Sequence, residues 1–156
     1  MGEGANPTTE DIVSKYQIKR TEQQYVLSEE SAVEQVMALL TYYDIDVDRL
    51  AGGNDLQEAS LEKTFDQLTD YVRRGLVEVG ENGTVTQHLG SGQTLQYAEI
   101  GAKHKLVMDK VPQGQQYAKM YALMGSLASC GSTAIEKLPA KDLAVVEVLS
   151  TVFSNA

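Results

Sequence analysis

The sequence predicts a single α+β domain with N-terminal helices, a small central antiparallel β-meander, and C-terminal helices packed on it. Apolar residues recur at helical spacing on both sides of a middle segment, in which short strand-like runs are separated by glycine-containing turns. A length of 156 residues is enough for one hydrophobic core. We divide the chain into a flexible tail at 1–7, an acidic helical region at 8–54, and a helix, meander and helices body at 55–156.

The acidic region is expected to contain two helices. The first is a short one at Glu10–Tyr16, after Thr8 or Thr9. The second follows Ser28, where Ser-Glu-Glu-Ser precedes apolar residues at helical spacing, so Ser28 is a suitable N-cap with acidic residues in the first turn. The stretch 44–54 then interrupts the periodicity and is expected to be a connection.

The segment 60–89 contains the most consistent local signals in the chain. Leu61, Phe65, Leu68 and Val72 recur at helical spacing, and Gly75 is placed to end that helix in the left-handed conformation. Strands are predicted at 76–79 and 84–89, joined by Gly-Glu-Asn-Gly, whose Asn-Gly pair favours a type I′ hairpin turn. A helix packed on a hairpin follows from this pattern.

The rest of the body is expected to finish the meander and then return to helices. The segments 94–100 and 103–108 are predicted as one or two further strands. A helix over 117–127 ends at Cys130-Gly131, and a short helical turn covers 133–138. Pro139 suits the first turn of a final helix, which has apolar residues on a broad face.

Charge and composition exclude several classes of function. The formal charge is −9, and residues 1–60 carry twelve Asp or Glu against four Lys or Arg. Such an acidic chain is a poor nucleic-acid binder, because phosphate neutralisation needs a basic surface. No apolar run is long enough to cross a bilayer, and the first residues lack the pattern of a signal peptide. We therefore expect a cytoplasmic protein that binds neither nucleic acid nor membranes.

Asp44-Ile45-Asp46-Val47-Asp48 is the one motif that resembles a metal loop. Three carboxylates at alternate positions are how a calcium-binding loop begins. The sixth position is Arg49 instead of glycine, and the twelfth is Asp55 instead of glutamate. Turn and capping roles explain these acids better, although a small calcium-responsive regulator or enzyme that uses this run stays an alternative.

No catalytic or metal-binding set is predicted from the remaining polar residues, and no cofactor is expected. His88 and His104 are the only histidines, and both are placed on predicted strands. Together with Cys130 they are too few for a structural zinc site, which needs about four ligands. Cys130 ends a helix in Leu-Ala-Ser-Cys-Gly, where a small buried residue or spacer is the expected role; a Cys-His pair is the alternative.

The arrangement of the body resembles the assembly chaperones of long-tailed bacteriophages, the small proteins encoded beside the tail tape-measure protein. One matching part is the helix end YVRRGLVEV, the GENG turn and the strand TVTQHL. The other runs from Met120 to Ser129, through IEKLPAKDL, to a terminal helix ending near Phe153. Together these parts cover roughly residues 55–155, while the acidic region before them has no counterpart in the family pattern.

The resemblance implies a non-enzymatic protein that binds the helical tape-measure chain during tail assembly in the bacterial cytoplasm. The C-terminal helices are then the candidate surface for this partner or for self-association into a homo-oligomer, since methionine and tyrosine suit adaptable interfaces. The alternative for the same side chains is the core. A structural virion component, such as a tail or connector subunit, is the alternative function. The candidate partner-binding residues are Met120, Tyr121, Met124, Val145, Val148 and Val152.

Overall fold

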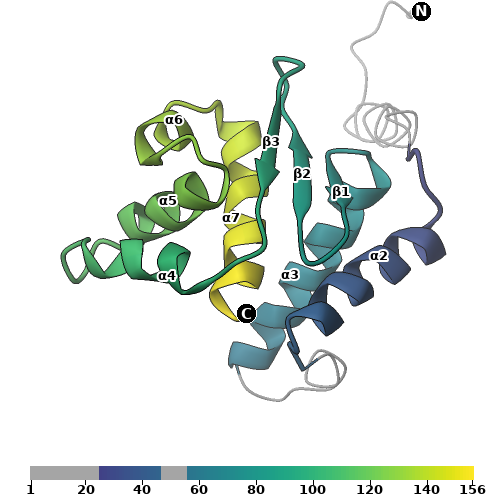
Figure 1. Cartoon of the computed structure of the whole chain (residues 1–156). Helices are drawn as coiled ribbons and strands as arrows, with labels where there is room; N and C mark the ends of the chain where they lie inside the picture. The colour runs from purple at the N-terminus through teal and green to yellow at the C-terminus, as the bar shows by residue number, and fades with distance from the viewer. Residues whose placement is uncertain (1–24, 47–55) are drawn as a thin grey trace, which may run out of the picture.

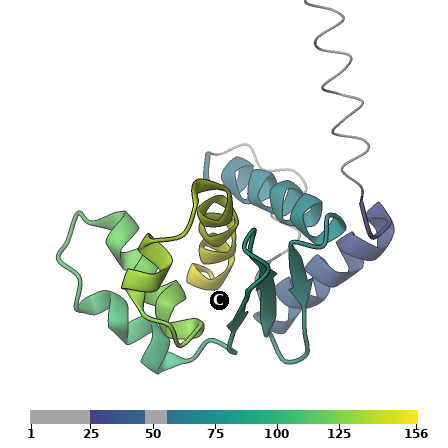
Figure 2. The same cartoon turned by 90° about the horizontal axis from the view of Figure 1, so that it is seen from above.

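The fold is α+β, as predicted, with six helices and one three-stranded antiparallel sheet in the residues that the computed structural model describes, 25–46 and 56–156. The predicted tail at 1–7, the helix at Glu10–Tyr16, and Asp48, Arg49 and Asp55 of the aspartate run lie outside these residues. Figures 1 and 2 show helices behind the sheet and on both sides of it.

The first described helix, α2 (Glu29–Tyr42), begins where the sequence predicts. Ser28 is its N-cap, and the Ser31 amide donates to Ser28 Oγ at 3.1 Å. Such a cap contributes about 1 kcal/mol to stability. At the other end, Asp44 adopts a positive φ of 55°, and the Asp44 and Ile45 amides donate to the carbonyls of Thr41 and Leu40. These two bonds form a Schellman motif, which satisfies the last carbonyls of the helix.

Helix α3 (Leu56–Arg73) ends through the same motif at Gly75, as predicted. Gly75 has a φ of 77°, its amide donates to the Val72 carbonyl, and the Leu76 amide donates to the Tyr71 carbonyl. Strand β1 (Val77–Val79) follows at once, so the end of the helix determines where the sheet begins.

The sheet has the order β1-β2-β3, with β2 (Val85–His88) between β1 and β3 (Thr94–Tyr97). Val79 pairs with Val85 across the first turn, and Val85 pairs with Tyr97 on the other side. Alternation along the strands places one set of side chains toward the helices. These inward residues are Val77, Val79, Val85, Gln87, Leu95 and Tyr97. The opposite face is polar and largely exposed, and carries Glu78, Thr86, His88, Thr94 and Gln96.

The segment 103–108, predicted as a strand, is helical instead: α4 spans Ala102–Asp109. Its less exposed positions, His104, Val107 and Met108, have helical rather than alternating spacing. The Gly101 amide donates to His104 Nδ1 at 2.9 Å, which caps the first turn from a side chain inside the helix. Burial, and then repulsion by Lys103, lowers the pKa of His104, so its ring is kept neutral and able to accept this bond.

The C-terminal helices follow the predicted pattern closely. They are α5 (Gln116–Leu127), the short α6 (Ser132–Glu136) and α7 (Ala140–Ser154), with Pro139 as the N-cap of α7. Helix α5 ends in a third Schellman motif, at Ser129, and the Cys130 and Gly131 amides both donate to the Gly125 carbonyl. A Cβ at Gly125 would lie 2.4 Å from the Gly131 carbonyl carbon, so this turn requires glycine inside the helix.

Helix α7 is the centre of the core. It packs against α3 and α5, and the sheet lies in front of it (Figures 1 and 2). Gln87, which is fully buried, donates from Nε2 to the Asp142 carbonyl at 3.0 Å and accepts from the Tyr97 hydroxyl at 2.7 Å. Asp142 Oδ1 accepts from the Gly90 amide at 3.1 Å. These bonds join β2, β3 and the turn between them to the first turn of α7.

The turn between β1 and β2 has the geometry that its Asn-Gly pair predicts. Asn82 and Gly83 have φ values of 56° and 74°, and the Thr84 amide donates to the Glu81 carbonyl. Tyr43 lies over the turn: its hydroxyl donates to the Gly83 carbonyl at 2.5 Å and accepts from the Ile100 amide at 3.2 Å. One phenol therefore connects α2, the hairpin turn and the segment after β3.

Gly83→Ala is expected to destabilise the fold by about 3 kcal/mol, because a positive φ and a crowded position are both penalised. Its Cβ would lie 2.4 Å from Tyr43 Oη and 2.7 Å from Tyr42 Cδ2. Gly92→Ala is the matched control: Gly92 also has a positive φ, but its Cβ would meet nothing within 4 Å. It should lose only about 1 kcal/mol. Equal losses in urea unfolding would contradict the packing of Tyr42 and Tyr43 on this turn.

Candidate partner-binding surface

The structure separates the six predicted partner-binding residues into two groups. Met124, Val145, Val148 and Val152 are buried, with at most 7% of each residue exposed. Their side chains have almost no surface that a partner could contact in this fold, because α7 is enclosed by the sheet, α3 and α5. Met120 and Tyr121, on the earlier turns of α5, are only half-buried. The binding role remains a prediction, and the residues that can serve it are these two and their neighbours.

Helix α5 presents a pair of aromatic side chains. Tyr117 and Tyr121 are four residues apart, so they lie on the same face, with ring centroids 6.2 Å apart. Tyr117 is 63% exposed. Tyrosine offers a large and relatively rigid contact area with a polar end, which is why it is enriched in protein interfaces.

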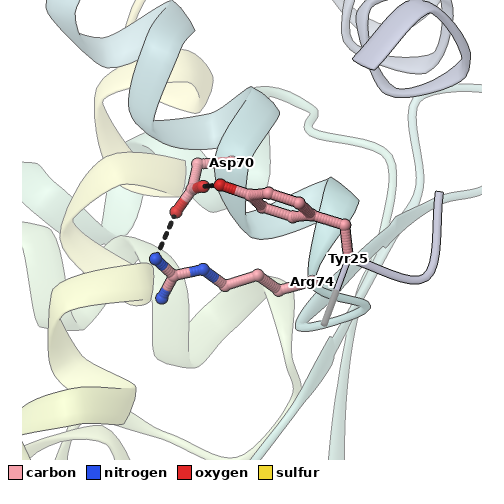
Figure 3. Close-up of polar contacts among 3 residues, drawn as sticks. All are labelled: Tyr25, Asp70 and Arg74. Atoms are coloured by element: carbon pink, nitrogen blue, oxygen red, sulfur yellow. Dashed lines mark hydrogen bonds and ion pairs between the residues drawn. The ribbon is translucent and has the colours of Figure 1, made fainter. Parts of the chain in front are cut away.

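The C-terminal end of α3 carries a second group of interacting side chains, shown in Figure 3. Asp70 accepts from the Tyr25 hydroxyl at 3.1 Å and forms an ion pair with Arg74 at 3.0 Å. The Arg73 guanidinium lies 3.7 Å from the centroid of the Tyr25 ring. The Val26 and Leu27 amides both donate to the Arg73 carbonyl, which fastens the segment before α2 to the end of α3.

Arg73 and Arg74 lie at the C-terminal end of α3, where a positive charge interacts favourably with the helix dipole. The contacts above give each of them a specific side-chain partner as well. Arg74 is engaged by Asp70 one turn earlier, and Arg73 by Tyr25. The α3 face in front of them is an open hollow of about 370 Å³. Its lining consists of Asp66, Gln67, Asp70, Tyr71 and Arg74.

Glu147 of α7 connects the α3 group to the α5 pair. Burial raises the pKa of Tyr71; among nearby charges Arg74 lowers it, while Asp70 and Glu147 raise it. Burial also raises the pKa of Tyr121. The nearby Glu147, Tyr117 and Glu136 raise this pKa further, in that order of importance. One carboxylate therefore acts on tyrosines from two different helices. We call Tyr71, Tyr117, Tyr121, Glu136 and Glu147 the Tyr–Glu surface.

Helical spacing explains why Glu147 is available there. Helix α7 is buried on most sides, and Ala144, Glu147 and Thr151 lie on its partly exposed stripe. Glu147 is the one charged residue in the run from Leu143 to Phe153. That single carboxylate in an apolar run was the sequence signal for this stripe, and the spacing of Tyr117 and Tyr121 was the signal for the aromatic pair. Tyr117 and Glu147 were not among the predicted partner-binding residues.

The aspartate run is only partly within the described residues. Asp44 occupies the left-handed position of the Schellman motif that ends α2, a backbone role that accounts for a short polar side chain there. Asp46 is exposed. Across residues 25–46 and 56–156, no three His, Cys, Asp or Glu side chains come together as a potential metal site.

Cys130 is exposed, so it is not the buried residue that was one of its two expected roles; the role of a spacer stays a prediction. Its backbone lies in the Schellman turn at Ser129, where the Cys130 amide donates to the Gly125 carbonyl. Partial burial of the sulfur still raises the pKa of the thiol, the opposite of the shift that activates a nucleophilic cysteine. His88 pairs with Glu78 at 3.2 Å, and His104 caps α4, so each histidine has a local partner.

Comparisons with known proteins returned no match, whether to a protein-family model, to a curated protein or to a solved structure. Among the helices of the described residues, none combines the length and the apolar character needed to cross a membrane. The function proposed below is therefore argued from the residues of this chain and the resemblance they carry.

Glu147→Gln should lower the pKa of both Tyr71 and Tyr121, because a nearby carboxylate disfavours the phenolate and the amide carries no charge. The pKa of each of these two phenols is higher in the folded chain than in the unfolded chain. The stability that they contribute is therefore present below about pH 10 and is lost above it, as the phenols ionise. NMR titration of the tyrosine Cζ carbons measures each group. Tyr43 is the control, since its pKa is raised by burial and Glu99, with an opposing effect of the Ile100 amide. Unchanged titration of Tyr71 and Tyr121 would remove Glu147 from the Tyr–Glu surface.

Proposed function

We propose that this protein is a non-enzymatic tail-assembly chaperone of a long-tailed phage or prophage, which binds the tape-measure protein in the bacterial cytoplasm. The resemblance in the YVRRGLVEV, GENG and TVTQHL segments supports this proposal. In the fold these segments are the end of α3 with β1, the β1–β2 turn, and β2. The second resembling part spans α5 to α7.

The observation that carries the protein-binding part of the proposal is the partly exposed aromatic pair on α5, in which the ring centroids of Tyr117 and Tyr121 lie 6.2 Å apart. This pair belongs to the Tyr–Glu surface. That surface lies across the two resembling parts, since Tyr71 belongs to the first and Tyr121 and Glu147 to the second. Half-buried tyrosines are held in place by their surroundings, so they lose little side-chain freedom on binding. The carboxylates select a partner that presents basic residues beside its apolar ones.

The proposed partner is an amphipathic segment of the tape-measure chain. Such a segment covers Tyr117, Tyr121 and Met120 with apolar side chains and places Lys or Arg near Glu147 and Glu136. Truncation of central aromatic residues in protein interfaces commonly costs 1 kcal/mol or more. The acidic N-terminal region, with its excess of carboxylates, favours solubility of the complex.

Co-expression with the tape-measure protein, which the proposal expects to be encoded by a long, helix-rich reading frame beside this one, tests this directly. The two chains should co-purify, and the double variant Tyr117→Ala/Tyr121→Ala should weaken the complex at least tenfold, from the loss of two central aromatic contacts. The matched control is Gln96→Ala/Thr94→Ala, on the exposed face of the sheet. If the full-length chains remain separate under these conditions, the chaperone proposal is wrong.

A structural virion component is the competing function, and the fate of the chain distinguishes it from a chaperone. A chaperone leaves before the particle is complete, so mass spectrometry of purified virions should detect no stoichiometric amount of this protein. Retention at a fixed ratio to the tail proteins would instead establish a structural subunit.

A further inference from the structure

A groove lies between α2 and the β1–β2 turn, away from the Tyr–Glu surface. It has a volume of about 350 Å³, and its apolar part is formed by Ala38, Leu39 and Val79. Tyr42 forms one wall, and the turn residues from Gly80 to Gly83 form the other. Tyr42 is 45% exposed, so the aromatic wall faces solvent.

The surroundings of this groove are acidic. Glu81 belongs to its lining, and Glu99 accepts a hydrogen bond from the Tyr42 hydroxyl. Glu34 is exposed one turn before Ala38 on α2. Helix α2 contains no Lys or Arg, and neither does the hairpin from Val77 to His88. An apolar group with basic neighbours is therefore the complementary occupant.

Helix α4 presents such a group on the other side of the molecule. Leu106 is 58% exposed although it lies in the middle of the helix. Lys103 and Lys110 lie three residues before and four residues after it, on the same side of α4 and its C-cap, while the adjacent Lys105 donates to the Ala156 carbonyl. Asp109 is the one acidic residue of α4, so the exposed leucine has a net positive border.

We propose that Leu106 of one copy of this protein inserts into the groove between α2 and the β1–β2 turn of a second copy. The apolar groove receives the leucine, while the lysines around it meet Glu34, Glu81 and Glu99. Opposite charges at the two borders favour this pairing and disfavour contacts of groove with groove or of α4 with α4.

The resulting contact is heterologous, because the groove and α4 are different surfaces of the same chain. Figures 1 and 2 show α2 and α4 on opposite sides of the sheet. One chain can therefore use its groove and its Leu106 at the same time. Repetition of such a contact gives a ring if the rotation closes and a filament if it does not. This inference is independent of the proposed chaperone function.

Two single variants of the full-length chain test the contact. Leu106→Glu removes the leucine and reverses the local charge, while Ala38→Lys places a cation at an exposed position in the groove. Light scattering during size-exclusion chromatography, from micromolar to millimolar concentration, should show wild-type oligomers and monomers of each variant. An equimolar mixture should form a one-to-one dimer and nothing larger, because Leu106→Glu retains a groove and Ala38→Lys retains a leucine.

Two further variants serve as controls. Val26→Glu changes another exposed apolar residue, and Ala134→Lys introduces a lysine at another exposed helical position. Both should assemble like the wild type, and added salt should weaken wild-type assembly. Leu106→Ala preserves helix propensity and should raise the dissociation constant at least tenfold, which keeps the test valid if Leu106→Glu unfolds α4. A monomeric wild type, oligomers of either variant alone, or no dimer in the mixture would overturn the proposal.

Discussion

The position of the sheet against α7 depends on one buried polar side chain, Gln87. It points toward the helices from the central strand, at a register position where the neighbouring strands place Val77 and Leu95. An unpaired amide there would cost several kcal/mol, so its bonds to the Asp142 carbonyl and the Tyr97 hydroxyl are requirements of the fold. Apolar packing alone tolerates sliding, whereas these directional bonds define a single position for the sheet along α7.

The fixed position of α7 against the sheet also determines which of its residues reach the protein surface. With Gln87 and Asp142 fixing the start of α7, the helical period determines which residues meet the sheet, α3 and α5, and leaves Ala144, Glu147 and Thr151 on the partly exposed stripe. Tyr71 and Tyr121 then lie on either side because their helices pack against α7. The Tyr–Glu surface is thus a consequence of how α7 is enclosed.

Features determined by local backbone chemistry could be predicted from the sequence. Gly75 and the Asn82-Gly83 pair show the positive φ values expected of them, and Ser28 caps α2. Features determined by tertiary contacts could not. The segment 103–108 is too short for its period to be decisive, and its helix depends on the His104 cap and on packing against α5. Similarly, the sequence could show that Met124 and Val145 lie on apolar faces, but not that both faces are covered.

The two proposed contacts are physically compatible because they share no residue. The groove involves α2 and the β1–β2 turn, and Leu106 belongs to α4, whereas the Tyr–Glu surface combines α3, α5, α6 and α7. A row of copies joined through Leu106 that leaves the Tyr–Glu surface of each copy open presents that surface repeatedly along the row. Several modest contacts with one long partner then act together, and the effective concentration within the row raises the overall affinity without any new interface. An extended helical chain is the kind of partner that benefits most from such repetition, because it offers successive segments to successive copies.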